Sequence, residues 1–480
     1  MSETSLTKEA EGLIIKFAWI VRISSESDRR KIEAISMTKG KRAESRCRYL
    51  IRETASQKGW NVKHPQNGGD FLEEQEIEDY FPGSGLKKMK PDFLVCKQYS
   101  PIMVVEAKNE IDKIDTALSE AIEYADAINT GGKYTVNIAV GVAGEEDHGY
   151  LFKTVIRTNG RWIPLTSHGF GLTSFPSVSE VETALLTNNG TTEVAIPGVA
   201  DYITIAIELS ALLRAAKIEP SLRPKVLGAV ITALYQGEID LSNGNELTSV
   251  NGLVRTAILS TEHFENEKKK QLIETLYLAD ADYARLAPKM GRIVYTLKRL
   301  NIKSILRTDT DFLGLLYEAF IRYGYDNNSL GIVFTPRHIT KFCADLIEVT
   351  ARDKVIDIAC GSGGFLVAAF DRMIRSSEQL GIPYAVIRES LYGFDTNPTV
   401  WALAALNMFF RGDGKSHIEN ASCFDDGSRQ SVRGRFSKAL LNPPFSQADE
   451  PERDFYFYCN GGAGYAWYAC GSSKIRDLCR

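Results

Sequence analysis

The stretch VIDIACGSGGFL (Val355–Leu366) decides the fold, and LYGFDTN (Leu391–Asn397) and ALLNPPF (Ala439–Phe445) repeat part of its pattern. Each begins with a short apolar run typical of a buried strand and ends in small or polar residues. In the first stretch a glycine-rich turn and an apolar segment follow, which predicts a strand, a tight loop and a helix. Open α/β sheets bind ligands just beyond the carboxyl ends of their strands. We therefore predict a Rossmann-like domain whose ligand site lies at these strand ends.

The residues at the three predicted strand ends suit a nucleoside ligand and a second planar group. Glycines after Asp357 let the backbone approach a ligand closely, and the helix that follows begins with N–H groups that have no partner within the helix. Asp395 follows the second apolar run, where a carboxylate can bind ribose hydroxyls. Asn442 follows the third, and its planar amide stands beside two prolines and the aromatic ring of Phe445.

These three motifs, in this order, resemble those of N6-adenine DNA methyltransferases from type I and fused type II restriction–modification enzymes. The resemblance covers most of the chain from Asp311 to Asp454. It implies that S-adenosylmethionine is the cofactor, with its methionine part in the Asp357-x-x-x-Gly-x-Gly loop and its ribose on Asp395. In the family a Thr-Pro turn also closes over the cofactor. The cofactor-binding residues that the resemblance implies are Thr335, Pro336, Asp357, Cys360, Gly361, Gly363 and Asp395.

The motif Asn442-Pro443-Pro444-Phe445 is, by the same resemblance, the site that receives the target adenine. Enzymes that modify a base extrude it from the duplex, because its amino nitrogen is out of reach inside the stack. The resemblance implies that the Asn442 side chain and the Pro443 carbonyl accept hydrogen bonds from that amino group, while Phe445 stacks on the ring. The catalytic residues implied here are Asn442, Pro443, Pro444 and Phe445.

The N-terminal third contains a second constellation of charged residues, Asp92, Glu106 and Lys108. They belong to two apolar runs, Pro91–Val95 and Ile102–Lys108, which a turn separates and which together predict a hairpin. Glu106 and Lys108 are two residues apart, so they point to the same face of one strand. Two carboxylates in one small space favour Mg²⁺, which can activate a water molecule for phosphodiester cleavage. We therefore predict Asp92 and Glu106 as magnesium ligands and, with Lys108, as catalytic residues.

This second constellation resembles the PD-(D/E)xK nuclease core found at the N-terminus of type I restriction subunits and related fusions. In that family a following helix carries Gln-x-x-x-Tyr, for which this chain has Glu120 and Tyr124 at the same spacing. Glutamate in place of glutamine departs from the pattern. The preceding predicted helix has a basic face that includes Arg48 and Arg52, which fits either solvent or phosphate contacts. Glu44 on that helix is a further candidate for the site.

Length and composition are those of a soluble multidomain protein. The chain has 480 residues, 44% of them hydrophobic and 25% charged, and its net charge of −4 excludes a generally cationic nucleic-acid coat. No signal peptide or membrane-spanning run is predicted, and the eight cysteines lack metal or disulfide spacing, so we expect a cytoplasmic protein with no membrane partner. No Walker loop is present, so any motor would belong to another subunit.

We predict an α/β multidomain chain. Its ranges are 1–38, unassigned; 39–165, a restriction-endonuclease-like α/β core; 166–200, a linker; 201–310, a helical connector; 311–454, a partial methyltransferase domain; and 455–480, an atypical tail. Because the tail has no periodicity, we hypothesise a truncated or frame-shifted end. An incomplete methyltransferase sheet would expose the strand of the Asn-Pro-Pro-Phe motif as an edge, and we expect methyltransferase activity to be impaired.

The predicted function is that of a restriction–modification protein. It combines a Mg²⁺-dependent DNA endonuclease with an S-adenosylmethionine-dependent DNA adenine-N6 methyltransferase. Its expected partners are double-stranded DNA and a separate specificity or intact modification subunit. The alternatives are a catalytically inactive DNA-binding partner or remnant of such a system, and a methyltransferase that acts on RNA or protein. The nuclease constellation argues against the last of these.

Overall fold

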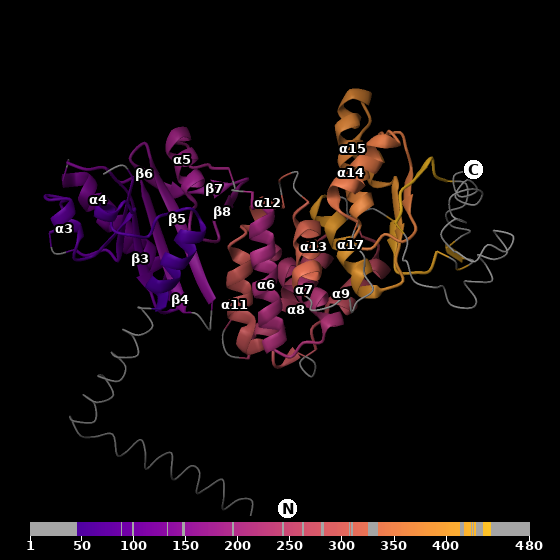
Figure 1. Cartoon of the computed structure of the whole chain (residues 1–480), viewed down its shortest axis with the longest axis horizontal. Coiled ribbons are helices and arrows are strands. Elements are labelled where there is room, and N and C mark those ends of the chain that lie inside the picture. The colour runs from indigo at the N-terminus through magenta and orange to yellow at the C-terminus, as the bar shows by residue number, and fades with distance from the viewer. Residues whose placement is uncertain are drawn as a thin grey trace, which may run out of the picture. The chain divides into compact units, whose positions relative to one another are not determined.

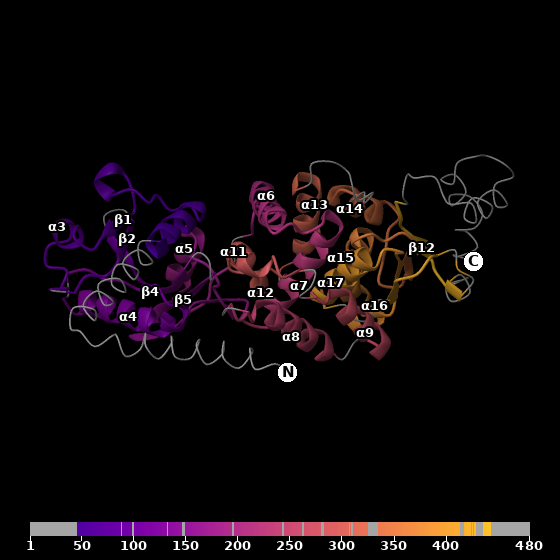
Figure 2. The ribbon, with the colours of Figure 1, turned by 90° about the horizontal axis from the view of Figure 1, so that it is seen from below.

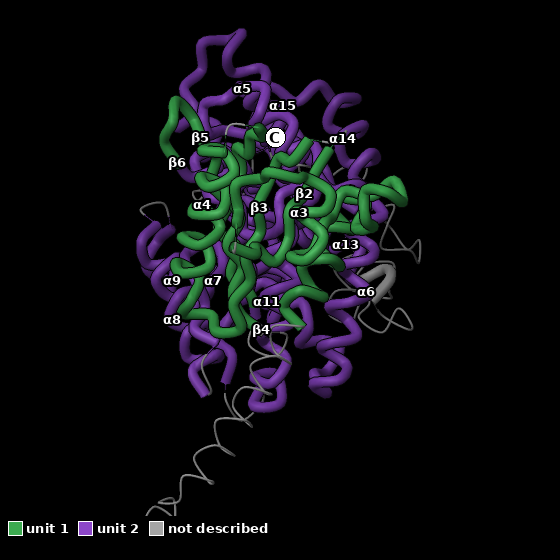
Figure 3. The backbone as a smooth tube through the Cα atoms, turned by 90° about the vertical axis from the view of Figure 1, so that its left-hand side faces the viewer, with its two compact units in different colours: residues 1–146, 150–162 green, residues 147–149, 163–480 purple. Residues whose placement is uncertain are grey.

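The computed structural model describes residues 46–87, 89–97, 100–131, 133–145, 149–193, 196–241, 244–261, 264–279, 283–306, 308, 311–324, 335–412, 417–423, 425, 427–428 and 435–442, with the backbone alone for 321–324. Its elements are labelled along the chain in Figure 1. The chain divides into two compact units, coloured separately in Figure 3. Unit 1 comprises residues 1–146 and 150–162, and unit 2 comprises residues 147–149 and 163–480.

Unit 1 is built on a six-stranded sheet whose strand order follows the chain. β3 is antiparallel to β2 and parallel to β4, and the long helix α4 provides the crossover that a parallel pair requires. This helix packs on both β3 and β4. The strands are β1 Phe71–Glu73, β2 Phe93–Lys97, β3 Ser100–Lys108, β4 Ile138–Glu145, β5 Gly149–Thr158 and β6 Arg161–Pro164; the helices are η1 Pro65–Asn67, α3 Ile77–Tyr80, η2 Ile111–Lys113 and α4 Ile114–Gly131.

The register between β2 and β3 brings the predicted nuclease residues to one level. Phe93 pairs with Val105, so Asp92, just before β2, reaches the level of Glu106 near the end of β3. The hairpin predicted from the two apolar runs is therefore confirmed. Residues 46–57 are helical, and the predicted apolar face is buried there at Cys47, Leu50, Ile51 and Ala55.

Within unit 2, the described residues from 199 to 324 are mainly helical, as the sequence predicts for most of this range. In Figures 1 and 2 α6 and α13 lie side by side, and α7 packs on α8. Their buried residues belong to one continuous apolar cluster that extends into the parallel sheet of the C-terminal part, for example from Leu209 through Val230 to Val355 and Leu391. The helices are α6 Val199–Ala215, η3 Pro220–Leu222, α7 Arg223–Gln236, α8 Glu246–Leu259, α9 Asn266–Leu276, α11 Ala287–Lys298, α12 Ile302–Ile305 and α13 Phe312–Gly324.

The C-terminal part of unit 2 carries a parallel four-stranded sheet in the order β11-β10-β9-β12. The predicted strands of the first two motifs are confirmed as β9 and β10, with β9 between β10 and β12. α15 packs on β9 and β10, and α17 packs on β11. The strands are β9 Val355–Asp357, β10 Leu391–Phe394, β11 His417–Glu419 and β12 Lys438–Ala439; the helices are α14 Arg337–Leu346, α15 Gly364–Leu380, α16 Tyr384–Arg388 and α17 Pro398–Phe410.

The segment predicted as a linker, residues 166–200, contains regular structure. β7 (Thr166–Ser167) pairs with β8 (Phe170–Gly171), and α5 (Val178–Thr187) follows. Ser177 and Glu180 form a capping box at the start of α5, with a side chain of each accepting a hydrogen bond from the backbone N–H of the other. The polar residues that suggested a linker thus serve partly as helix caps.

Among the described residues, no helix combines the length and apolar character needed to cross a bilayer.

Candidate functional site

A pocket lies at the carboxyl ends of β9 and β12, where the predicted cofactor and adenine motifs meet. Parallel strands end at one edge of a sheet, so residues far apart in the sequence converge there. Pro336 and Gly363 directly adjoin lining residues, and Asp395 contacts one through a hydrogen bond. Predicted site residues that line the pocket are Thr335, Asp357, Cys360, Gly361 and Asn442.

Asp357 ends β9 and is almost completely buried, with 1% of its surface exposed. Its Oδ1 accepts a hydrogen bond from the backbone N–H of Ala359 at 3.1 Å. The pKa of Asp357 is raised to about 8: burial and the nearby charge of Asp395 raise it, and the Ala359 N–H acts in the opposite direction. Burial therefore favours the protonated form of this carboxyl.

Asp395 follows β10 and holds the glycine loop in place. Its Oδ2 accepts a hydrogen bond from the backbone N–H of Gly361 at 3.1 Å, and its Oδ1 accepts one from Asn397 at 2.8 Å. Burial raises the pKa of Asp395, and these two N–H donors lower it. The predicted ribose acid therefore contacts the loop predicted to hold the methionine part.

The loop between β9 and α15 needs glycine at two positions. Gly361 has φ +56° and Gly363 has φ +82°, in the left-handed region that other residues rarely adopt. A side chain at Gly361 would meet no other atom within 4 Å, so the space beside it is open. Cys360 is buried between these turns, and burial raises the pKa of its thiol, which therefore contributes shape rather than charge to the pocket.

Asn442 and Thr335 meet across the pocket. The Asn442 Nδ2 donates a hydrogen bond to the Thr335 Oγ1 at 3.0 Å. With the amide nitrogen engaged in this way, its Oδ1 is oriented as the acceptor of the group. Pro443, Pro444 and Phe445 lie outside the described residues.

Comparison with known proteins identifies the part of the chain that holds this pocket. Residues 308–467 match the family of N-6 DNA methylases. The chain is 42% identical over 143 residues to the type II restriction enzyme and methyltransferase RM.BcgI of Heyndrickxia coagulans, across 29% of this chain and 22% of that relative. It is 30% identical over 208 residues to the type I restriction enzyme MjaIX methylase subunit of Methanocaldococcus jannaschii, across 42% of this chain and 34% of that relative.

The C-terminal part is an N6-adenine DNA methyltransferase domain of the restriction–modification type. The chain spans only 22% and 34% of the lengths of the two relatives. Among solved structures, the methyltransferase subunit of a type I restriction–modification system from Streptococcus thermophilus aligns with a TM-score of 0.35 and 17% identity, across 57% of this chain and 70% of that one.

The methyltransferase domain places a residue in the pocket that the motif analysis missed, Arg337. It begins α14 and directly follows the predicted Thr335-Pro336 turn, which was the available signal. Its Nε lies 2.9 Å from the Asp311 Oδ2. The neighbouring His338 is exposed on α14.

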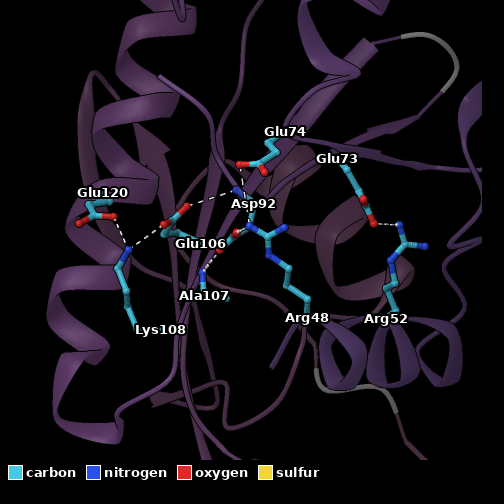
Figure 4. Close-up of polar contacts among 9 residues, drawn as sticks. All are labelled: Arg48, Arg52, Glu73, Glu74, Asp92, Glu106, Ala107, Lys108 and Glu120. Atoms are coloured by element: carbon cyan, nitrogen blue, oxygen red, sulfur yellow. Dashed lines mark hydrogen bonds and ion pairs between the residues drawn. The ribbon is translucent and has the colours of Figure 1, made fainter. Parts of the chain in front are cut away.

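The second candidate site lies in unit 1, where Asp92 and Glu106 are both buried (Figure 4). The Asp92 Oδ2 accepts a hydrogen bond from the Ala107 backbone N–H at 2.7 Å, and the Glu106 Oε2 accepts a longer one from the Asp92 N–H at 3.3 Å. The pKa of Glu106 is raised to about 8: burial and the Asp92 charge raise it, and Lys108 lowers it. Because the Asp92 charge disfavours ionisation of Glu106, a divalent cation beside both would favour the charged form.

Lys108 lies between two carboxylates in the same site. Its Nζ donates to the Glu106 Oε1 at 2.8 Å and to the Glu120 Oε2 at 2.6 Å. Burial lowers the pKa of Lys108, but these two bonds outweigh burial and raise it overall, so the amine stays charged. Burial and the charges of Glu106 and Glu120 raise the pKa of Tyr124 to about 12. Glu120, the departure from the family's glutamine, thus contacts the predicted catalytic lysine directly.

The basic helix face predicted before this site contacts its carboxylates. Figure 4 shows Arg48 paired with Asp92 and Glu74, and Arg52 paired with Glu73. Both arginines stay partly exposed beside these ion pairs, with 30% and 35% of their side chains accessible, and contact with phosphate stays a prediction. Across the described ranges, no group of three or more potential metal-ligating side chains occurs. Glu44 lies outside the described residues.

Proposed function

We propose that the methyltransferase domain transfers a methyl group from S-adenosylmethionine to the N6 atom of adenine in double-stranded DNA. The observation that carries this proposal is the single pocket lined by Asp357, Gly361 and Asn442. The residues fit the cofactor: the open space beside Gly361 admits a ligand against the backbone, and Asp357 and Asp395 offer carboxylates for the amino group and the ribose.

In this proposal the cofactor supplies an electrophilic methyl group, and the chain positions the two reactants. The Asn442 Oδ1, oriented by the bond from its Nδ2 to Thr335, accepts a hydrogen bond from the adenine amino group. This draws the nitrogen lone pair toward the methyl group. Pro443 and Phe445 act through a carbonyl acceptor and a stacking ring, as the family resemblance implies. Cys360 and Gly363 shape the loop, and Pro336 starts the turn that covers the cofactor.

Isothermal titration with S-adenosylmethionine tests the pocket, and transfer of a labelled methyl group to unmethylated DNA tests the activity. We expect Asp395→Ala to weaken cofactor binding about tenfold or more, because it removes both a ribose partner and the acceptor that holds Gly361. Asp345→Asn, which changes an exposed carboxylate paired with Arg372, is the matched control. Undiminished affinity in Asp395→Ala would remove the ribose assignment.

For unit 1 we propose a Mg²⁺-dependent DNA endonuclease, with Asp92 and Glu106 as metal ligands and Lys108 stabilising charge on the phosphate. The convergence of these side chains at the end of β3 supports this second activity. A magnesium ion would hold the attacking water and offset the repulsion between the two carboxylates. The alternative is that unit 1 is catalytically inactive and only binds DNA.

Cleavage of unmethylated DNA in Mg²⁺ separates these two readings of unit 1. We expect Asp92→Ala and Lys108→Ala each to reduce cleavage about a hundredfold or more. Lys153→Ala, which removes a lysine from an exposed pair with Asp115, should cleave normally. Cleavage that survives both site substitutions would show that the catalytic site lies elsewhere, and no cleavage by the unaltered chain would favour the inactive alternative.

The partners we propose are double-stranded DNA and a separate subunit that supplies specificity or an intact modification domain. One of the relatives is named as the methylase subunit of a type I restriction enzyme, which supports a partner subunit. Analytical ultracentrifugation of the full chain with unmethylated duplex DNA, with and without such a subunit, tests this proposal.

A further inference from the structure

The Arg337 side chain is enclosed between two backbone surfaces that lack a Cβ atom. A Cβ at Gly314 on α13 would lie 1.9 Å from the Arg337 Nη2, and a Cβ at Gly364 on α15 would lie 2.5 Å from the Arg337 Nη1. A side chain at either position would therefore displace the guanidinium group from where it lies. The side chain is 12% exposed and lines the cofactor pocket.

The ion pair with Asp311 leaves buried donors of Arg337 without an acceptor among the described residues. The Arg337 Nε lies 2.9 Å from the Asp311 Oδ2, a charge contact without the alignment of a hydrogen bond. Within the described residues, the buried Arg337 Nη1 has no hydrogen-bond acceptor. A buried donor without an acceptor costs about 1–3 kcal/mol, so its presence beside a pocket indicates a ligand group that accepts from it.

The surroundings of the Nη1 atom favour a negatively charged ligand group. It lies beside Gly364, the first residue of the 17-residue helix α15, whose first-turn N–H groups carry partial positive charge. Asp395 is engaged by the N–H groups of Gly361 and Asn397. Guanidinium groups bind planar carboxylates through two parallel bonds.

We propose that Arg337 binds the carboxylate of the methionine part of S-adenosylmethionine and thereby selects amino-acid-bearing cofactors over analogues that lack this group. The inference rests on the proposed cofactor of this domain. It gives Arg337 a ligand contact beyond the ion pair with Asp311. Gly314 and Gly364 are then positioning residues, because only glycine leaves room for the guanidinium group there.

The experiment compares two ligands that differ only in this carboxylate, S-adenosylmethionine and its decarboxylated analogue, by isothermal titration. We expect the unaltered chain to bind S-adenosylmethionine at least tenfold more tightly. Arg337→Gln should weaken S-adenosylmethionine binding tenfold or more and change binding of the decarboxylated analogue less than twofold. Lys341→Gln, which removes a positive charge from the exposed side of the same helix, is the control and should leave both affinities unchanged.

Each outcome decides between the carboxylate contact and a purely structural role. If Arg337 only joins α13 to α14 through Asp311, Arg337→Gln weakens both ligands equally, which overturns the inference. If Arg337→Gln does not fold, Arg337→Lys, which keeps the charge but loses the paired donors, should reduce the preference between the ligands; an unchanged preference contradicts the inference. Equal binding of both ligands by the unaltered chain overturns it without any variant and leaves the cofactor site intact. Binding of neither ligand removes the proposed cofactor itself.

Discussion

Asp357 shows how burial beneath the glycine loop converts an ordinary carboxylate into a group that holds its proton near neutral pH. Its pKa is about 8 in the folded chain, against an ordinary value of 3.8. Between these values the folded state binds more protons than the unfolded state, so the free energy of unfolding falls as pH rises. One such group contributes a slope of at most about 1.4 kcal/mol per pH unit.

We therefore expect Asp357→Asn, which cannot ionise, to gain stability relative to the unaltered chain as pH rises from 5.5 to 7.5. Urea unfolding of both proteins at the two pH values measures this difference. Other buried carboxyls such as Asp371 titrate in both proteins, so their contributions cancel in the comparison. A difference that stays constant with pH would contradict the buried, protonated state of Asp357.

Thr335 is predicted to act mainly through Asn442. Because its Oγ1 accepts the bond from the Asn442 Nδ2 at 3.0 Å, Thr335→Val should let the amide rotate and slow methyl transfer about three- to tenfold. The cofactor Kd, measured by titration, should change less than the transfer rate. Thr335→Ser keeps the hydroxyl and should restore transfer; failure of that rescue would indicate that the Thr335 methyl group, and not its hydroxyl, matters.

At the scale of elements, a glycine in the loop between β9 and α15 and a glycine at the end of α15 allow the effect of backbone strain to be distinguished from the effect of ligand contact. Gly361 (φ +56°) and Gly381 (φ +64°, at the C-terminal end of α15) both have left-handed backbone, and a Cβ at either would meet no other atom within 4 Å. Alanine at either should lower the free energy of unfolding by about 1–2 kcal/mol. Only Gly361 lines the pocket.

We expect Gly361→Ala to weaken binding of S-adenosylhomocysteine severalfold, because the methyl group of the introduced alanine enters the ligand space. Gly381→Ala should leave binding unchanged. Urea unfolding and titration of both variants give the two quantities separately. Equal loss of binding in the two variants would mean that the loop responds to general destabilisation, and that Gly361 has no particular role.

The strands and turns around the candidate sites could be predicted from the sequence where an apolar run is followed by turn residues. β9, β10 and the hairpin of β2 and β3 follow from local patterns, because short apolar runs bounded by turn residues are typical of buried strands. The region around α5 was harder, because its serine and threonine residues suit both loops and helix caps. Only the capping box of Ser177 and Glu180 distinguishes the two.

At the scale of the whole molecule, the two compact units have separate apolar cores. The cluster around Leu94, Val104 and Ala121 lies in unit 1, and the cluster from Leu209 to Trp401 lies in unit 2. A ligand stabilises only the unit that binds it, by about 2.7 kcal/mol at a concentration of 100 times its Kd.

Differential scanning calorimetry of the full chain should therefore show two unfolding transitions. S-adenosylhomocysteine should raise the midpoint temperature of only one of them. Asp395→Ala should abolish that shift at the same ligand concentration. If the ligand raises both midpoint temperatures equally, the units do not unfold independently. If it raises neither midpoint temperature, the pocket in unit 2 does not bind this ligand.

The sequence by itself determined the order of the chemistry-bearing motifs, because each is local: Asp357 with its glycine loop, Asp395 after an apolar run, and Asp92, Glu106 and Lys108 on two adjacent strands. Only the tertiary structure showed the bond between Asn442 and Thr335, the enclosed guanidinium group of Arg337, and the pairing of Arg48 with Asp92. These contacts join segments that are distant in the sequence, and they depend on strand order and on glycines that admit close approach. A linear pattern of residue types does not encode either property.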